Sequence, residues 1–231
     1  MTQREVNEPA HDKAADEAPD EAPDEAPDLE RLAAACRDRL TGMPGDAPSA
    51  DAWLFARLVA AREVRGERAL LGLSASDFAD LAARHFVAGS LADVLREPSA
   101  NMANMANMAN VAGVAIADEK HAAFADAMRG FLFSLAAPDV DDADAHCLAA
   151  ILAHACLRPD HLWRDLGLSG REDVTQMLTR FFPAVVARNT EGLRWKKLLA
   201  RELALATGDV PGPAPGCPGC EDFGFCFGHA R

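Results

Sequence analysis

Apolar positions along this chain recur at helical spacing and do not alternate strictly with polar ones. Alanine and leucine abound, whereas only two isoleucines and no tyrosine occur. Because alanine and straight-chain residues favour helices, while β-branched and aromatic residues favour strands, the pattern predicts an all-α fold. We expect a single helical domain over residues 51–207, preceded by a short helix and linker over 29–50.

Two stretches of the helical region resemble each other. GLSASDFADLAARHF at 72–86 matches GLSGREDVTQMLTRFF at 167–182 apart from one inserted residue. Upstream, the alanine-rich ARLVAA at 56–61 lines up with AILAHA at 150–155. The match indicates either two helical-hairpin units packed face to face or a chance likeness between alanine-rich helices.

Two serines have the spacing of helix-capping boxes. Ser74 precedes Asp77 by three residues, and Ser169 precedes Glu172 by three. In such a box the serine side chain accepts a backbone N–H of the first helical turn. A helix should therefore begin directly after each serine.

The chain ends and one internal tract have compositions of their own. Residues 1–28 contain the run DEAPDEAPDEAPD, in which no apolar side chain exceeds alanine, so we expect a disordered acidic tail. NMANMANMAN at 101–110 predicts a low-complexity loop insertion, although its thioethers are also soft metal ligands. Residues 208–231 form a tail rich in cysteine, glycine and proline.

Charge and hydropathy exclude several classes of protein. The formal net charge is −13, of which the first 28 residues supply −8, and no basic stripe suits a nucleic-acid backbone. No apolar run approaches the length of a membrane span, and the opening residues do not resemble a secretory signal. We therefore expect a cytoplasmic protein, in which clustered cysteines indicate metal binding and not disulfides.

The tail carries the clearest chemical signal. Cys217, Cys220 and Cys226 form a C-x2-C-x5-C pattern, and two residues separate the last of them from His229. Glycines and prolines let the backbone turn around an ion, and nothing adjacent in the sequence would bury the thiols, so the tail has no expected part in the core. The pattern predicts a metal centre.

Two kinds of centre fit these ligands. Three thiolates with His229 make a Cys3His set, which tetrahedral zinc accepts readily in a structural module that recognises a protein partner. Alternatively, three cysteines can ligate three irons of an iron-sulfur or mixed-metal cluster and leave one corner open for exchange. Spacing alone leaves both readings open.

The remaining cysteines and histidines have simpler interpretations. Cys156 and His161 are candidate additional ligands if the tail folds back onto them. A buried cysteine also behaves as a small hydrophobe, which is the simpler interpretation of Cys156, Cys36 and Cys147. His161 also suits the start of a helix.

A cationic helix face precedes the tail. Arg194, Lys197 and Arg201 fall at positions i, i+3 and i+7, where they could attract an anion or an acidic partner, or simply be solvated. The opposite face is apolar and should pack against the domain. Its members are Trp195, Leu198, Leu199 and Leu203.

Three runs together resemble one family. They are ACLRPDHLWRDLGLSGRED at 155–173, FFPAVVARNTEGLRWKKLLARELA at 181–204 and APGCPGCEDFGFCFG at 214–228. These runs are similar to the NifQ family of nitrogenase cofactor assembly.

The resemblance implies a molybdenum carrier. Such a protein takes up molybdenum derived from molybdate, holds it in a molybdenum-iron-sulfur cluster, and has the cofactor scaffold and the nitrogenase iron protein as partners. The family's cluster motif is C-x4-C-x2-C-x5-C, whose last three positions match Cys217, Cys220 and Cys226. Its first position is Gly212 here, so the implied site has three thiolates and needs a substitute ligand.

Enzymatic signatures are missing from the sequence. It contains no G-x-S-x-G, no phosphate-binding glycine loop and no H-E-x-x-H. We therefore expect a metal-cluster carrier without turnover chemistry.

Overall fold

The computed structural model describes residues 26–42, 48–90 and 119–228, and within these ranges it contains helices and no strands. The all-α prediction is confirmed. The acidic repeat up to residue 25, the tract 101–110 and His229 lie outside the described residues. The α-helices are α1 (Ala26–Thr41), α2 (Ala50–Glu63), α3 (Ala75–His85), α6 (Glu119–Phe133), α7 (Asp142–Ala155), α8 (Leu162–Asp165), α9 (Arg171–Phe181), α10 (Pro183–Ala187), α11 (Trp195–Thr207) and α12 (Phe223–Phe227). Two short 3₁₀ helices complete the set, η1 (Arg68–Leu71) and η2 (Cys217–Gly219).

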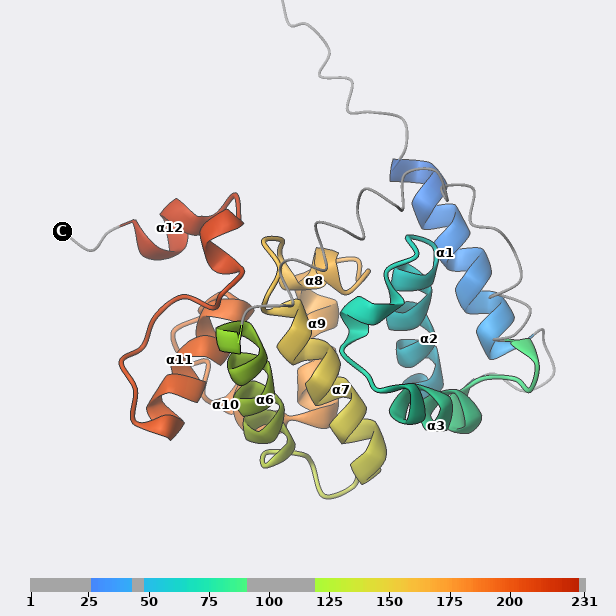
Figure 1. The fold of residues 1–231 in the computed structure, drawn as a ribbon, viewed down its shortest axis with the longest axis horizontal. Coiled ribbons are helices and arrows are strands. Elements are labelled where there is room, and N and C mark those ends of the chain that lie inside the picture. Colours follow the sequence, from blue (N-terminus) through green and yellow to red (C-terminus); the bar gives the residue numbers. More distant parts are fainter. Residues whose placement is uncertain (1–25, 43–47, 91–118, 229–231) are drawn as a thin grey trace, which may run out of the picture.

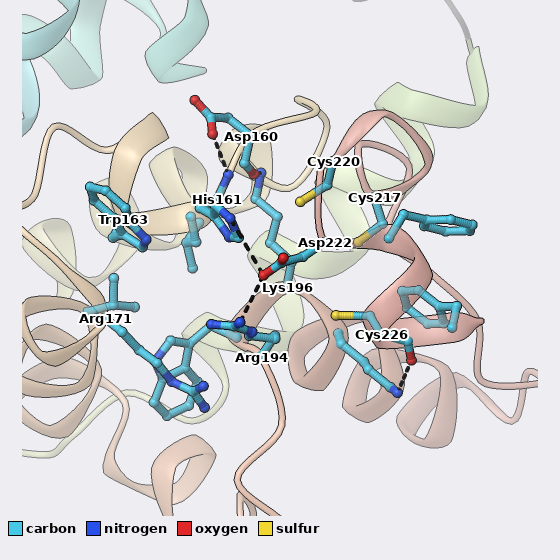
Figure 2. Close-up of a pocket in the computed structure, with 16 residues that line it drawn as sticks. Asp160, His161, Trp163, Arg171, Arg194, Lys196, Cys217, Cys220, Asp222 and Cys226 are labelled. Atoms are coloured by element: carbon cyan, nitrogen blue, oxygen red, sulfur yellow. Dashed lines mark hydrogen bonds and ion pairs between the residues drawn. The ribbon is translucent and has the colours of Figure 1, made fainter. Parts of the chain in front are cut away.

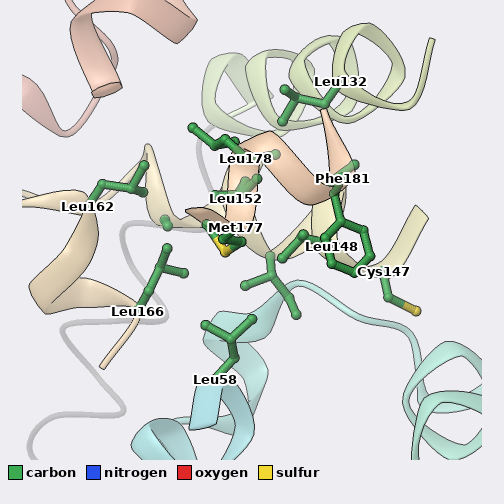
Figure 3. Close-up of a cluster of buried hydrophobic side chains, with 14 of the residues drawn as sticks. Leu58, Leu132, Cys147, Leu148, Leu152, Leu162, Leu166, Met177, Leu178 and Phe181 are labelled. Atoms are coloured by element: carbon green, nitrogen blue, oxygen red, sulfur yellow. The ribbon is translucent and has the colours of Figure 1, made fainter. Parts of the chain in front are cut away.

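The helices surround one core. Helices α1, α2 and α3 lie together at one end, α7 and α9 pass through the middle, and α11 and α12 lie at the other end (Figure 1). Leu58 of α2, Leu152 of α7 and Phe181 of α9 are almost completely buried where these helices meet (Figure 3). No helix in the described part of the chain is long and apolar enough to cross a membrane.

The two similar sequence stretches form two similar structural units. The order α2, η1, α3 repeats as α7, α8, α9, with matching lengths of 14, 4 and 11 residues. Gly72 and Gly167 occupy corresponding turns with left-handed φ angles of +70° and +67°. A side chain on Gly72 would collide with His154 of the second unit, and one on Gly167 with Ala61 of the first.

Buried polar contacts between the units are reciprocal. Arg62 of the first unit donates to the carbonyl of Asp165 in the second, and Arg158 of the second donates to the carbonyl of Leu70 in the first, at 2.9 Å. Both arginines also pair with the Asp165 carboxylate, which is buried. Burial alone would raise the pKa of Asp165, but the Arg158 hydrogen bond and the surrounding cations hold it below its ordinary value.

A second reciprocal pair lies at the helix starts. Arg84 of α3 pairs with Asp144 in the first turn of α7 at 2.8 Å, and Arg180 of α9 pairs with Asp51 in the first turn of α2 at 3.1 Å. A chance likeness between alanine-rich helices would not produce matching contacts in both directions. The structure therefore favours two helical-hairpin units packed face to face.

The two predicted helix caps have different outcomes. Ser74 caps α3 as predicted, because its hydroxyl accepts the N–H of the third helical residue at 3.1 Å. The predicted box of Ser169 with Glu172 is wrong, since Gly170 holds the cap position of α9 and offers no side chain. The inserted residue moves Ser169 away from the helix start, and its hydroxyl accepts from Arg57 at 3.1 Å.

Candidate metal centre

Cys217, Cys220 and Cys226 line one cavity of about 60 Å³. Three segments form its walls: residues 160–163 before and within α8, residues 194–197 at the start of α11, and the tail from η2 through α12. In Figure 2 the three cysteines lie along the tail side of the cavity. The fold thus brings together residues that are about 60 positions apart in the sequence.

The tail is seated on the turn that follows α7. The N–H of Gly216 donates to the carbonyl of Cys156 at 3.0 Å, and a Cβ atom on Gly216 would lie only 1.9 Å from the carbonyl oxygen of Arg158. Ala214 and Cys217 are buried in the core cluster. The expectation that the tail has no part in the core is therefore wrong, because adjacent residues do not reveal which distant turn covers a segment.

Lys196 stabilises the turn on which the tail rests. Its ammonium is buried and donates to the carbonyls of Arg158, at 2.9 Å, and of Asp160. Burial raises the pKa of the Cys217 thiol, while the positive charge of Lys196 acts in the opposite direction. The ammonium therefore favours a thiolate at this position when a metal displaces the proton.

Cations also surround the exposed side of the cavity. Burial raises the pKa of Cys226 against the opposing charges of Lys197 and Arg194. Arg194 pairs with Asp222 at 2.8 Å, and Lys197 donates to the carbonyl of Cys226. The cavity is lined by four cationic side chains, those of Arg171, Arg194, Lys196 and Lys197. Only two carboxylates line it. These cations oppose the penalty that burial places on negative charge inside the cavity.

The cationic face predicted for α11 is only partly at this site. Arg194 and Lys197 line the cavity, whereas Arg201 pairs with Glu191 at 2.6 Å and does not line it. The opposite face is buried as predicted. No role at the site was assigned from the sequence to Trp163, Arg171 or Asp222, although each of them lies in one of the family-like runs.

The additional candidate ligands lie at different depths. His161 lines the cavity, its Nε2 lies 2.9 Å from Oε1 of Glu221, and it also holds the cap position of α8. Cys156 is completely buried beneath the tail, where burial raises its thiol pKa to about 12. Cys36 and Cys147 are buried in α1 and α7, as the simpler interpretation predicts.

The described ranges contain no group of three or more His, Cys, Asp or Glu side chains close enough to hold a single metal ion. The tail cysteines share a cavity wall without converging on one point. Whether they ligate a metal stays a prediction.

Comparison with known proteins identifies relatives. A family model described as NifQ matches residues 52–228. The NifQ homolog of Sinorhizobium fredii is 42% identical over 104 residues, which cover 45% of this chain and 44% of that protein. NifQ of Azotobacter vinelandii is 41% identical over 88 residues, covering 38% and 45%, and NifQ of Klebsiella pneumoniae is 36% identical over 85 residues, covering 36% and 51%.

The matched segment spans about half the length of these curated relatives. No solved structure matches the chain. The family match extends from α2 to the residue after α12, so it includes all three tail cysteines. The chain belongs to the NifQ family.

Proposed function

We propose that this protein is a carrier that supplies molybdenum for assembly of the nitrogenase iron-molybdenum cofactor, without catalytic turnover of its own. It receives molybdenum derived from molybdate and holds it in a molybdenum-iron-sulfur cluster. It then donates the metal to the cofactor scaffold, with the nitrogenase iron protein as a further partner, in the reducing cytoplasm. Its membership of the NifQ family supports this role.

One observation carries the proposal: the three tail cysteines share a cavity with more cations than carboxylates. Thiolates are soft ligands that suit iron-sulfur clusters, and each thiolate and bridging sulfide adds negative charge. Arg194, Lys196 and Lys197 offset that charge in a chain whose overall net charge is −13.

The positions of the candidates support His161 as the fourth ligand. His161 lines the same cavity as Cys217, Cys220 and Cys226, so it is the best-placed substitute for the thiolate that the family motif has at Gly212. Cys156 would have to leave a fully buried position to reach the cavity. His229 lies outside the described residues.

Metal analysis of the anaerobically purified full chain tests this proposal. We expect a brown protein that contains iron, sulfide and molybdenum. A colourless protein with one zinc and no sulfide would contradict the carrier and would establish the zinc-stabilised interaction module.

A cysteine substitution locates the cluster. Cys220 is only partly buried, so Cys220→Ala should abolish retention of iron and sulfide while leaving the helical circular dichroism unchanged. Cys36→Ala removes a buried thiol of α1 that does not line the cavity, and it should retain the cluster. Equal loss in both variants would show that the tail is not the site.

A further inference from the structure

The tail divides into an anchored part and a more exposed part. In the anchored part Cys217 is buried, and a Cβ atom on Gly219 would lie 2.6 Å from the Cβ atom of Pro159. Residues 220–228, which we call the flap, include α12 and contain no buried residue. Cys217 therefore belongs to the anchored part, whereas Cys226 belongs to the flap.

Backbone contacts do not fasten the flap to the helical body in the part of the chain that the structure describes. The N–H groups of Cys220, Phe223 and Cys226 all donate to carbonyls within the tail. Phe223 and Phe227 pack only partly against the core, and Lys197 donates to the carbonyl of Cys226. The position of the flap therefore depends mainly on side-chain contacts.

Two adjacent carboxylates form what we call the latch between the flap and the body. Oε1 of Glu221 lies 2.9 Å from Nε2 of His161 and 3.3 Å from a guanidinium nitrogen of Arg164. Oδ2 of Asp222 lies 2.8 Å from a guanidinium nitrogen of Arg194 (Figure 2). The side chain of Glu221 is 62% exposed and that of Arg164 is 47% exposed. Exposed ion pairs are individually weak and are screened by salt, so the latch holds the flap only loosely.

The closed latch occupies one candidate ligand. An ionised carboxylate only accepts hydrogen bonds, so Nε2 of His161 carries the proton in its contact with Glu221. A protonated ring nitrogen has no lone pair for a metal. His161 can therefore ligate through this nitrogen only after Glu221 has left.

The closed cavity is also small for the proposed cluster. Its volume of about 60 Å³ gives room for roughly four to six water molecules, at about 10–15 Å³ each. A cuboidal cluster has a metal or sulfide atom at every corner and needs more space than that. Because Cys217 is anchored, the flap is the wall of the cavity that can move.

We propose that the flap is a lid, latched over the cysteine cavity by Glu221 and Asp222, that opens to admit the cluster and frees His161 when it does. The identity of the cargo rests on the proposed function, whereas the latch rests on contacts of the chain itself. Opening leaves His161 and Arg194, which both line the cavity, without their carboxylate partners.

Cleavage of the cluster-free full chain by chymotrypsin after Phe227 tests the latch. Phe227 is partly buried, so the cleavage rate follows the population of the open flap. Loss of two exposed ion pairs in Glu221→Gln with Asp222→Asn should raise this rate about 3- to 30-fold. Mass spectrometry of the peptide released from residues 228–231 measures it. A rate within about twofold of wild type would overturn the proposal.

The matched control removes the same charge elsewhere on the surface. Glu191→Gln with Asp139→Asn breaks exposed ion pairs to Arg201 and Arg180, outside the cavity. This variant should be cleaved after Phe227 at the wild-type rate. Equal acceleration in both double variants would indicate an effect of net charge and would contradict the latch.

Charge reversal separates a specific ion pair from a merely structural role of Arg194. Arg194→Glu should accelerate cleavage after Phe227 at least about threefold, because Asp222 then faces a like charge. Adding Asp222→Arg to this variant restores an opposite pair and should return the rate to within about twofold of wild type. Acceleration that persists in the reversed pair would refute the latch.

Uptake of iron tests the lid separately from the carrier. During anaerobic reconstitution with ferrous iron and sulfide, the Glu221→Gln and Asp222→Asn double variant should gain cluster absorbance about 3- to 30-fold faster than wild type, and the control variant at the wild-type rate. Equal uptake rates in all three chains would overturn the lid and leave the carrier intact. A chain that never takes up iron, but whose cleavage depends on the latch, would refute the proposed function and sustain the latched flap.

Discussion

Replacement of Gly216 by alanine tests whether the tail must rest on the turn after α7 to form the metal centre. A Cβ atom at this position would lie 1.9 Å from the carbonyl oxygen of Arg158 and 2.6 Å from the backbone nitrogen of the same residue. Backbone atoms cannot rotate away, so the tail must retreat by about 1.5 Å to restore ordinary van der Waals contact. That movement breaks the hydrogen bond from the N–H of Gly216 to Cys156.

The magnitude follows from the contacts that are lost. The hydrogen bond contributes about 0.5–1.5 kcal/mol, and the burial of Ala214 and Cys217 adds about 0.8 kcal/mol per methylene-sized group. A loss of roughly 2–3 kcal/mol in tail docking corresponds to an open population roughly 30–150 times larger. Gly224→Ala in α12 is the control, since its Cβ would meet nothing within 4 Å.

Hydrogen-deuterium exchange of the cluster-free chain measures this population directly. The non-proline amides of residues 214–220 should exchange about 30–150 times faster in Gly216→Ala, while those of α7 and α9 keep their protection. Iron and sulfide retention should fall in the same variant and remain at the wild-type level in Gly224→Ala. Exchange within about twofold of wild type in Gly216→Ala would refute the reasoning.

Three further predictions concern the missing family ligand and the buried ion pairs. Gly212→Cys should increase the iron and sulfide that survive gel filtration, because its Cβ meets nothing within 4 Å and its φ is not left-handed; unchanged retention would contradict the implied motif. Asp165→Asn should lower the free energy of unfolding in urea by about 3–5 kcal/mol, since it leaves Arg62 and Arg158 without their buried carboxylate. The exposed control Asp139→Asn should leave the urea midpoint unchanged, and equal effects would show that the buried pairs contribute little. The folded protein holds the pKa of Asp165 below its value of about 3.9 in the unfolded chain. The ionised Asp165 carboxylate therefore contributes to stability above about pH 4, and this contribution is lost as the pH falls through the folded pKa. The stability difference between wild type and Asp165→Asn should therefore narrow only below about pH 4, and narrowing near neutral pH would contradict this assignment.

The features that depend on local sequence pattern, namely the helices and the likeness of the two units, could be predicted from the sequence. Helix formation follows from alanine and leucine content and from the absence of strand periodicity, and the two units could be aligned because their turns share Gly72 and Gly167. The Ser169 cap was predicted wrongly, since one inserted residue moves the hydroxyl away from the helix start to Arg57.

Contacts between distant segments could not be predicted from pattern. The seating of Gly216 on Arg158 depends on how α7, α11 and the tail meet, and a glycine in a tail indicates only flexibility. In the sequence Lys196 is simply one more cation beside Lys197. In the folded chain it is buried and supports the turn beneath the cysteines. The buried indole N–H of Trp195, which has no acceptor among the described residues, is visible only in the folded chain, because its sequence position indicates nothing more than a packed aromatic residue.

X-ray absorption at the molybdenum K-edge of the anaerobically purified chain tests the central claim most directly. Molybdenum should have sulfur and iron neighbours in the wild-type protein and in Cys36→Ala, and both neighbour shells should disappear in Cys220→Ala. Molybdenum surrounded by oxygen alone in the wild-type chain, or sulfur and iron shells that persist in Cys220→Ala, would contradict a molybdenum-iron-sulfur cluster held by the tail cysteines.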